Sequence, residues 1–174
     1  MKVVILNDDT LQPSNAEAFQ SFVLQEKPKR IIVIPGTINQ IENKQINILR
    51  GMFEPRARVI PLVVRSQEIA EEDQVDVEAA IKSKVLDLGL RSVRDYVSDY
   101  LTDINALNSE ITYTLYRAYF KFYVAALGDV YTEKYERRRR SYQEQIIALN
   151  PTPGDILLTS EEDAYWYVDN IIFQ

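Results

Sequence analysis

Apolar positions recur at two different spacings along this 174-residue chain, and the change of spacing divides it into two parts. Short β-branched runs, which are typical of strands, occupy 2–6, 30–34 and 57–64. Pro61 lies inside the third run and indicates an edge strand or a bulge. From about residue 77 onward the apolar residues instead recur every three or four positions, as they do on helices. The pattern therefore predicts a strand-rich part followed by a helical part.

A helix is predicted between the first two strands. Ser14, with Glu17 three residues later, forms a capping-box pattern, and an apolar stripe follows it to about Lys27. The order strand–helix–strand, with the continuous apolar run 31–34, favours a small parallel βαβ unit. An antiparallel meander is the alternative. Residues 37–53 fit a helix in part and a pair of strands in part, so the pattern leaves that segment open.

The helical part is predicted to contain three segments. The first begins near residue 77 and ends at Gly89, and the second begins at Ser92. Asn108 or Ser109 caps the third, whose apolar and aromatic stripe continues to about residue 149 without a proline. Gly128 is the weak point of this stretch, which is either one long helix or a hairpin of two helices.

The end of the chain returns to strand-like patterns. Pro151 ends the helical stretch, and 155–159 and 165–173 then read as two strands of a β-hairpin. The acidic segment 160–163 is predicted to be the loop between them.

The predicted fold class is α+β, with a possible α/β arrangement in the N-terminal half. It has a small sheet with strands at both ends of the chain and a long helical hairpin or long helix in the C-terminal half. We expect a single domain over 1–174, with a strand-rich α/β part at 1–74, a helical part at 75–150 and a C-terminal β-hairpin at 151–174.

Composition narrows the chemistry. The chain has no cysteine and no histidine, which excludes disulfides, thiolate or imidazole metal sites and the usual nucleophile–histidine pairs. Its net charge of −6 argues against a protein that coats nucleic acid. The sequence thus predicts a non-enzymatic protein without a cofactor or metal. The beginning of the chain has no signal-peptide pattern and no apolar run is long enough for a membrane span, so a cytoplasmic location is expected.

Asp8 and Asp9 are the candidate ligand-binding residues. They directly follow the first predicted strand, and ligands of open α/β sheets bind at the carboxyl ends of strands. Paired aspartates at such a position could hold Mg²⁺ for a phosphate or nucleotide. The alternative is a turn in which both carboxylates accept hydrogen bonds from backbone amides.

Tyrosines and arginines of the third helical segment are the candidate interface residues, because both residue types are enriched in protein–protein contacts. These residues are Tyr116, Tyr119, Tyr123, Arg137, Arg138, Arg139, Arg140 and Tyr142. For the tyrosines, the alternative is packing of the helix within its own domain. For the arginines, the alternatives are a solvated face paired with glutamates one turn away and, less favoured, a contact with nucleic acid.

The segment 113–121, Tyr-Thr-Leu-Tyr-Arg-Ala-Tyr-Phe-Lys, is followed by 135–143, Tyr-Glu-Arg-Arg-Arg-Arg-Ser-Tyr-Gln. Together they resemble the helical hairpin of tailed-bacteriophage head-to-tail connector (adaptor, or neck) proteins. The resemblance implies a virion protein, assembled in the host cytoplasm, whose copies form a ring and contact portal or tail components.

Three functional hypotheses follow. The leading one is a structural assembly protein that forms a homo-oligomeric ring. The second is a small Mg²⁺-dependent α/β domain that binds a phosphate or nucleotide through Asp8 and Asp9. The third is a phage-encoded acidic inhibitor that captures its partner through residues 155–174.

Overall fold

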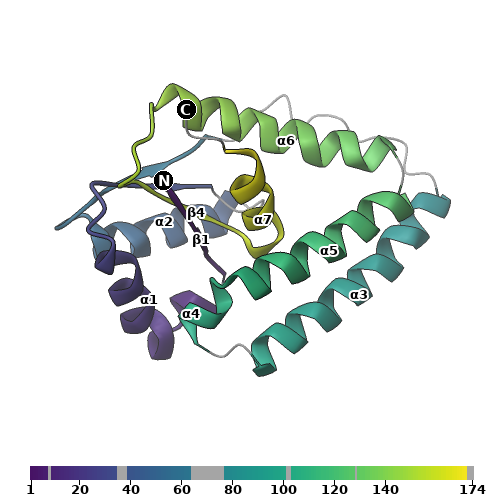
Figure 1. Ribbon diagram of the computed structural model, residues 1–174, viewed down its shortest axis with the longest axis horizontal. Coiled ribbons are helices and arrows are strands. Elements are labelled where there is room, and N and C mark those ends of the chain that lie inside the picture. The colour runs from purple at the N-terminus through teal and green to yellow at the C-terminus, as the bar shows by residue number, and fades with distance from the viewer. Residues whose placement is uncertain (8, 35–38, 64–76, 101–102, 128, 172–174) are drawn as a thin grey trace. The chain divides into compact units, whose positions relative to one another are not determined.

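The computed structural model describes residues 1–7, 9–34, 39–63, 77–100, 103–127 and 129–171 (Figure 1). Contacts within the chain define two compact units. We call residues 1–63 with 142–174 the sheet unit, and residues 64–141 the helical unit. Cooperative folding of both as the single predicted domain stays a prediction.

The sheet unit contains one four-stranded sheet in which every neighbouring pair is parallel. Its strands are β1 (Lys2–Ile5), β2 (Arg30–Val33), β3 (Arg58–Pro61) and β4 (Ile156–Thr159). Their order is β1-β4-β2-β3, so the last strand in the chain is inserted between the first two. This arrangement confirms the predicted fold class with strands at both chain ends, and the antiparallel alternative is wrong. Pro61 ends an edge strand, as predicted.

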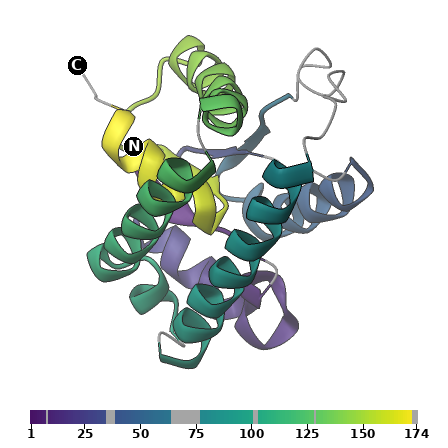
Figure 2. The same ribbon diagram turned by 90° about the vertical axis from the view of Figure 1, so that its right-hand side faces the viewer.

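Helices lie on both faces of this sheet. A 3₁₀ turn, η1 (Asp9–Leu11), leads into α1 (Pro13–Gln25), and α2 (Asn39–Phe53) joins β2 to β3. Phe19 of α1 packs edge-to-face on Phe53 of α2 with ring centroids 6.0 Å apart, so the two helices share one face. The last helix, α7 (Glu161–Asn170), lies on the other side of the strands from α2 (Figure 2). Residues such as Ile32 and Leu157 are consequently fully buried.

Two local predictions for the sheet unit need correction, and one open segment is resolved. The first helix begins at Pro13 after the extended Gln12, so Ser14 lies inside the helix and does not cap it. Proline fits the first helical position because its fixed φ is already helical and no hydrogen bond is lost there. Residues 39–53, which the pattern left open, are helical.

The predicted C-terminal β-hairpin is also wrong. The first strand of the pair exists as β4, but residues 161–170 form α7. β4 has parallel partners on both sides, so it has no free edge on which a returning strand could pair. Ala164 and Tyr167, three positions apart, are fully buried and give α7 an inward face of helical spacing.

The helical unit contains α3 (Val77–Tyr100), α4 (Ile104–Leu107), α5 (Glu110–Leu127) and the first part of α6 (Asp129–Ala148). Contacts pair α3 with α5 along their lengths (Figures 1 and 2). α3 continues through Gly89, so the predicted end at Gly89 and new start at Ser92 are wrong. The Ser92 hydroxyl donates to the Leu88 carbonyl inside this helix. The Tyr119 hydroxyl donates to the Leu86 carbonyl, and its ring lies 3.5 Å from where a Cβ of Gly89 would be.

The third predicted helical segment is two helices. Ser109 precedes α5 and its Oγ accepts a hydrogen bond from the Thr112 amide at 3.4 Å, as a capping residue does. α5 ends at Leu127 and α6 begins at Asp129, while Gly128 lies outside the described residues. In the described part of the chain, no helix combines the length and apolar character needed to cross a membrane.

Candidate functional site

The carboxyl ends of β1 and β4 are a topological switch point. These strands are neighbours, yet the chain leaves them toward opposite faces of the sheet. β1 continues through α1 toward β2, whereas α7 follows β4 and packs back on β1. In open parallel sheets, ligands bind in the crevice that such diverging connections create. The topology alone therefore makes this edge of the sheet a candidate ligand-binding site.

Asn7 ties the two diverging connections together. Its Nδ2 donates to Glu161 Oε2 at 3.3 Å, which joins the loop after β1 to the first residue of α7. Its Oδ1 accepts from the Thr10 amide at 3.0 Å, and the Thr10 hydroxyl donates to the Asn7 carbonyl at 2.7 Å. The loop after β1 thus has a fixed shape that presents the Asn7 side chain to α7.

Buried polar groups gather at the same edge. Thr159, the last residue of β4, is fully buried, and Glu161 and Asp163 are 8% and 2% exposed. The Thr159 hydroxyl has no hydrogen-bond partner in the described part of the chain. Burying such a group without a partner costs about 1–3 kcal/mol, so a native example calls for a functional or structural reason. The two carboxylates lie in the first turn of α7, where the helix dipole stabilises negative charge.

The predicted pair Asp8 and Asp9 points to this edge, but the described residues that meet there come from elsewhere. Asp8 lies outside the described residues, as does the side chain of Asp9, which begins η1. The sequence pattern did not indicate Thr159 and Glu161 as site residues, because 160–163 resembles a hairpin loop, whereas Glu161 begins α7. Recognition of β4 as a parallel neighbour of β1 would have revealed them. Over the ranges described here, no three acidic residues are grouped so that they could hold a metal ion.

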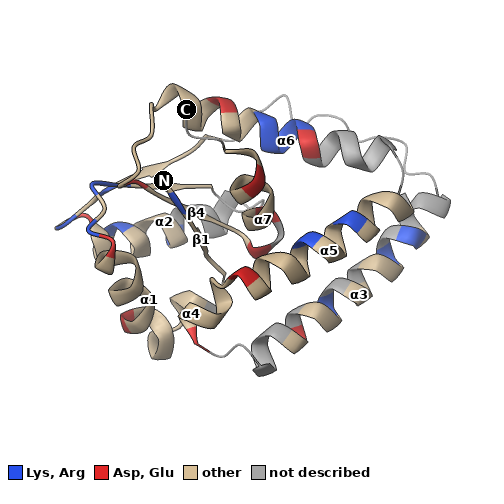
Figure 3. Cartoon of the chain, viewed as in Figure 1, with Lys and Arg blue, Asp and Glu red and all other residues tan. Residues whose placement is uncertain are grey.

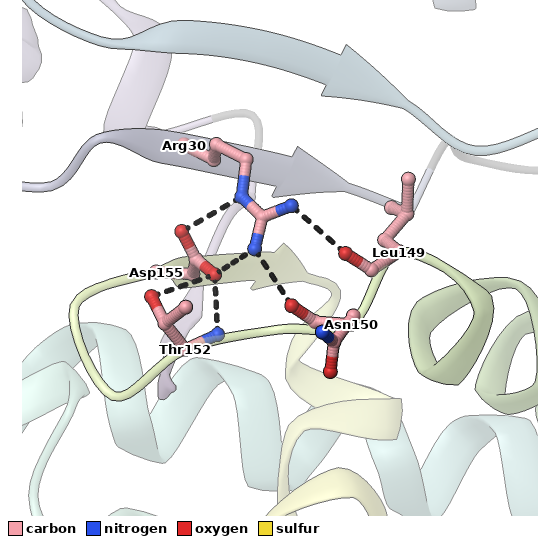
Figure 4. A network of polar contacts seen from close by, with 5 residues as sticks. All are labelled: Arg30, Leu149, Asn150, Thr152 and Asp155. Atoms are coloured by element: carbon pink, nitrogen blue, oxygen red, sulfur yellow. Dashed lines mark hydrogen bonds and ion pairs between the residues drawn. The ribbon is translucent and has the colours of Figure 1, made fainter.

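Arg30 and Asp155 form a second polar cluster at the amino ends of β2 and β4 (Figure 4). Arg30 Nε and Nη2 donate to the two Asp155 oxygens at 3.0 and 2.6 Å. The same guanidinium donates to the carbonyls of Leu149 and Asn150. Burial of Asp155 works to raise its pKa, but hydrogen bonds from Arg30 and Thr152 outweigh it, so the pKa lies below its usual value. With its donors directed to these four oxygens, Arg30 fastens the end of α6 to the sheet.

Most of the candidate interface tyrosines are buried within this one chain. Tyr116, Tyr123 and Tyr142 are each less than 5% exposed, and the half-buried Tyr119 bonds to α3. These positions fit the packing alternative that the sequence analysis kept open. Their role in an interface stays a prediction.

The four arginines of α6 have different environments. Arg139 is buried, with its guanidinium carbon 5.8 Å from the centre of the Phe120 ring. Arg140 is exposed and pairs with Glu136 one turn earlier at 2.8 Å, which confirms the expected pairing at that position. Arg137 is exposed and Arg138 is half-buried, so the run does not present one uniform surface.

One face of α3 carries exposed apolar side chains at helical spacing. Ile81, Val85, Leu88 and Tyr96 are each more than half exposed. Apolar residues at this spacing form a continuous stripe, which is typical of a surface that packs against another element.

No protein-family model, curated protein or solved structure matches this chain.

Proposed function

We propose that this protein is a small-molecule-binding α/β protein whose site lies at the carboxyl ends of β1 and β4. The observation that carries the proposal is the hydroxyl of the fully buried Thr159 at the switch point, which has no hydrogen-bond partner among the described residues. It lies next to α7, whose first residue is bonded to Asn7. A ligand that reaches this edge would supply the missing hydrogen-bond partner.

The position of the Thr159 hydroxyl supports ligand binding over a packing role. Valine has nearly the same shape as threonine, so it would fill the same space without burying a hydroxyl that has no partner among the described residues. The sequence instead places a hydroxyl where two connections diverge, which is where open α/β sheets bind their ligands.

A thermal-shift screen tests this proposal. A compound that binds the folded state raises the melting temperature in proportion to the logarithm of its concentration above Kd. The screen should contain sugars, nucleosides, nucleotides with and without MgCl₂, amino acids and polyamines. We expect at least one compound to raise the melting temperature of the natural protein and of an Asn47→Ala control, but not of Asn7→Ala. Asn47 is exposed in the middle of α2, which does not follow β1 or β4. Absence of a shift for every compound would contradict the proposal.

A second candidate function is self-assembly into a homo-oligomer, in line with the resemblance to phage connector proteins. The apolar stripe on α3 supports this candidate, because copies of the chain could bury it against one another. Light scattering at several concentrations tests it. A mass that rises above 20.2 kDa, and falls back in a Val85→Gln, Leu88→Gln double variant, would support assembly. An Ile147→Gln variant, changed at an exposed position of α6, is the control. A constant monomer mass would contradict self-assembly.

A further inference from the structure

We propose that the amino edge of the sheet binds the phosphate backbone of a nucleic acid. The surface consists of four exposed basic residues, Lys27, Lys29, Arg56 and Arg58, which we call the basic edge. It lies at the beginnings of β2 and β3, on the opposite edge of the sheet from the switch point. None of these residues belongs to the candidate ligand site at Thr159, so the two sites can be tested separately.

The basic edge is built from two segments that lie side by side. The Arg58 amide donates to the Lys29 carbonyl at 3.0 Å, which joins the start of β3 to the residue before β2. The register of the two strands continues this pairing, with Arg30 opposite Arg58. Figure 3 shows basic residues on adjoining segments at this edge. Neighbouring strands are about 4.8 Å apart, so side chains of both segments can contact one phosphate backbone.

The acidic residues that adjoin the basic edge in the chain already have basic partners. Glu26 forms an ion pair with Lys2 at 2.8 Å, and Glu54 forms one with Arg50 at 3.4 Å. Within the described ranges, none of the four side chains of the basic edge forms an ion pair. Four positive charges are therefore available to an anion from outside the molecule.

Helix ends account for only part of this arrangement. α1 and α2 both end at the basic edge, and the dipole of a helix stabilises cations near its C-terminus. That effect falls off within the last turn of the helix. Lys27 and Arg56 lie within three residues of the helix ends, but Lys29 and Arg58 lie four and five residues beyond them. A phosphate backbone gives these two cations a partner that the helices do not.

The lack of exposed apolar side chains favours a nucleic acid over a protein or a membrane. Protein interfaces are enriched in aromatic residues and depleted in lysine, and helices that lie on membranes insert apolar side chains. In the fully described segments 26–30 and 54–58, no large apolar side chain is exposed. Lysine and arginine contacts with phosphates, in contrast, supply essentially all of the non-specific binding of proteins to nucleic acid.

The net charge of −6 does not prevent such local binding. Exposed charges more than about 8 Å apart are largely screened from one another at physiological salt. A phosphate at the basic edge therefore responds mainly to the four cations beside it. Because only four cations contribute, we expect the binding to be weak at physiological salt and much tighter at low salt.

The experiment measures the fluorescence anisotropy of a labelled DNA duplex and of a labelled single-stranded RNA during titration with the full chain, at about 20 to 200 mM NaCl. We expect at least one of them to bind, with log K falling against log salt with a slope of about −3 to −4 for four phosphate contacts. The Lys29→Gln, Arg58→Gln double variant should weaken binding at least about tenfold and make the slope shallower by about 2. The Lys84→Gln, Arg91→Gln double variant, which removes the same charges from exposed positions of α3, is the control and should leave binding unchanged.

A second double variant, Lys27→Gln, Arg56→Gln, should weaken binding in the same way, and it keeps the test decisive if the first does not fold. If neither nucleic acid binds at the lowest salt, the proposal is overturned. Equal losses in the basic-edge variants and in the α3 control would also overturn it, because the binding would then follow total charge alone. Binding only to poly-L-glutamate, or only to phosphatidylserine vesicles, would overturn the assignment to nucleic acid.

Discussion

Asn7 and Glu161 are 154 positions apart in the chain, and yet Asn7 Nδ2 donates a hydrogen bond to Glu161 Oε2 at 3.3 Å. The contact exists because β4 enters the sheet beside β1 in parallel register, with Ile5 opposite Thr159. The loop after β1 and the start of α7 are then brought to one edge of the sheet. The candidate site is thus a product of strand order, and it forms only when both ends of the chain are folded together.

The first prediction concerns the stability of the ligand-free protein. Because the Thr159 hydroxyl is buried and none of the described residues bonds to it, Thr159→Val should raise the free energy of unfolding by about 1 kcal/mol. Thr114→Val is the control and should change it by less than about 0.5 kcal/mol. Urea unfolding of the three proteins measures this difference. A clear loss of stability in Thr159→Val would mean that the hydroxyl already has a favourable partner.

The second prediction concerns the cluster around Arg30. Arg30→Met should lower the free energy of unfolding by about 3 kcal/mol, because it leaves the carboxylate of Asp155 buried without its charged partner. The value is at the lower end of the usual range because the Arg30 side chain remains 26% exposed. Arg30→Lys should recover little of this loss, since an ammonium cannot donate to both oxygens as a guanidinium does.

Arg50→Met is the matched control for that prediction. Arg50 makes an exposed ion pair with Glu54 one turn away at 3.4 Å, and such pairs contribute about 0.3–0.5 kcal/mol. Equal losses in Arg30→Met and Arg50→Met would refute a special role for the cluster.

The third prediction is a dependence of stability on pH. The pKa of Asp155 is lower in the folded state than its ordinary value of 3.8. A lowered folded-state pKa means that the unfolded chain binds the proton more tightly. The contribution of Asp155 is therefore fully present above about pH 5 and is lost as the pH falls through its folded-state pKa. Urea unfolding between pH 7 and pH 3 should show a shallower acid loss in Arg30→Met than in the natural protein. Parallel curves would contradict the role given to this pair.

The fourth prediction tests the continuity of α3. Gly89 lies in the interior of a helix, where alanine is more favourable than glycine by roughly 0.5–1 kcal/mol. An added Cβ would lie 3.5 Å from the Tyr119 ring, an ordinary van der Waals distance. Gly89→Ala should therefore raise the melting temperature, whereas Gly89→Leu should lower it because the longer side chain meets Tyr119. Destabilisation by alanine would instead support the helix end that the sequence pattern predicted.

The strands could be predicted from the sequence because their signal is local. Runs such as 30–34 are β-branched and apolar throughout, as buried parallel strands are. Gly89 was misjudged because a helix-breaking residue gives the same local signal whether the helix ends or a neighbouring side chain, here Tyr119, packs closely against it. Residues 165–167 were predicted to be a strand because aromatic residues favour strands. They are helical because β4 is paired on both sides, and that pairing is known only from the folded sheet.

The site could be predicted only in part, for a related reason. The position of Asp8 and Asp9 after a strand pointed to the carboxyl edge of the sheet. The residues that meet Asn7 there come from the other end of the chain, and their place depends on the insertion of β4 between β1 and β2. Nothing in the local sequence around 156–163 encodes that order.

The most direct test of the central claim is a ¹⁵N–¹H correlation spectrum of the labelled protein, recorded during titration with the compound that gives the largest thermal shift. The account predicts that the amide signals that move most belong to residues 5–10 and 159–164, at the carboxyl ends of β1 and β4. Movements confined to other regions, such as α3 and α5, would contradict a binding site at the switch point.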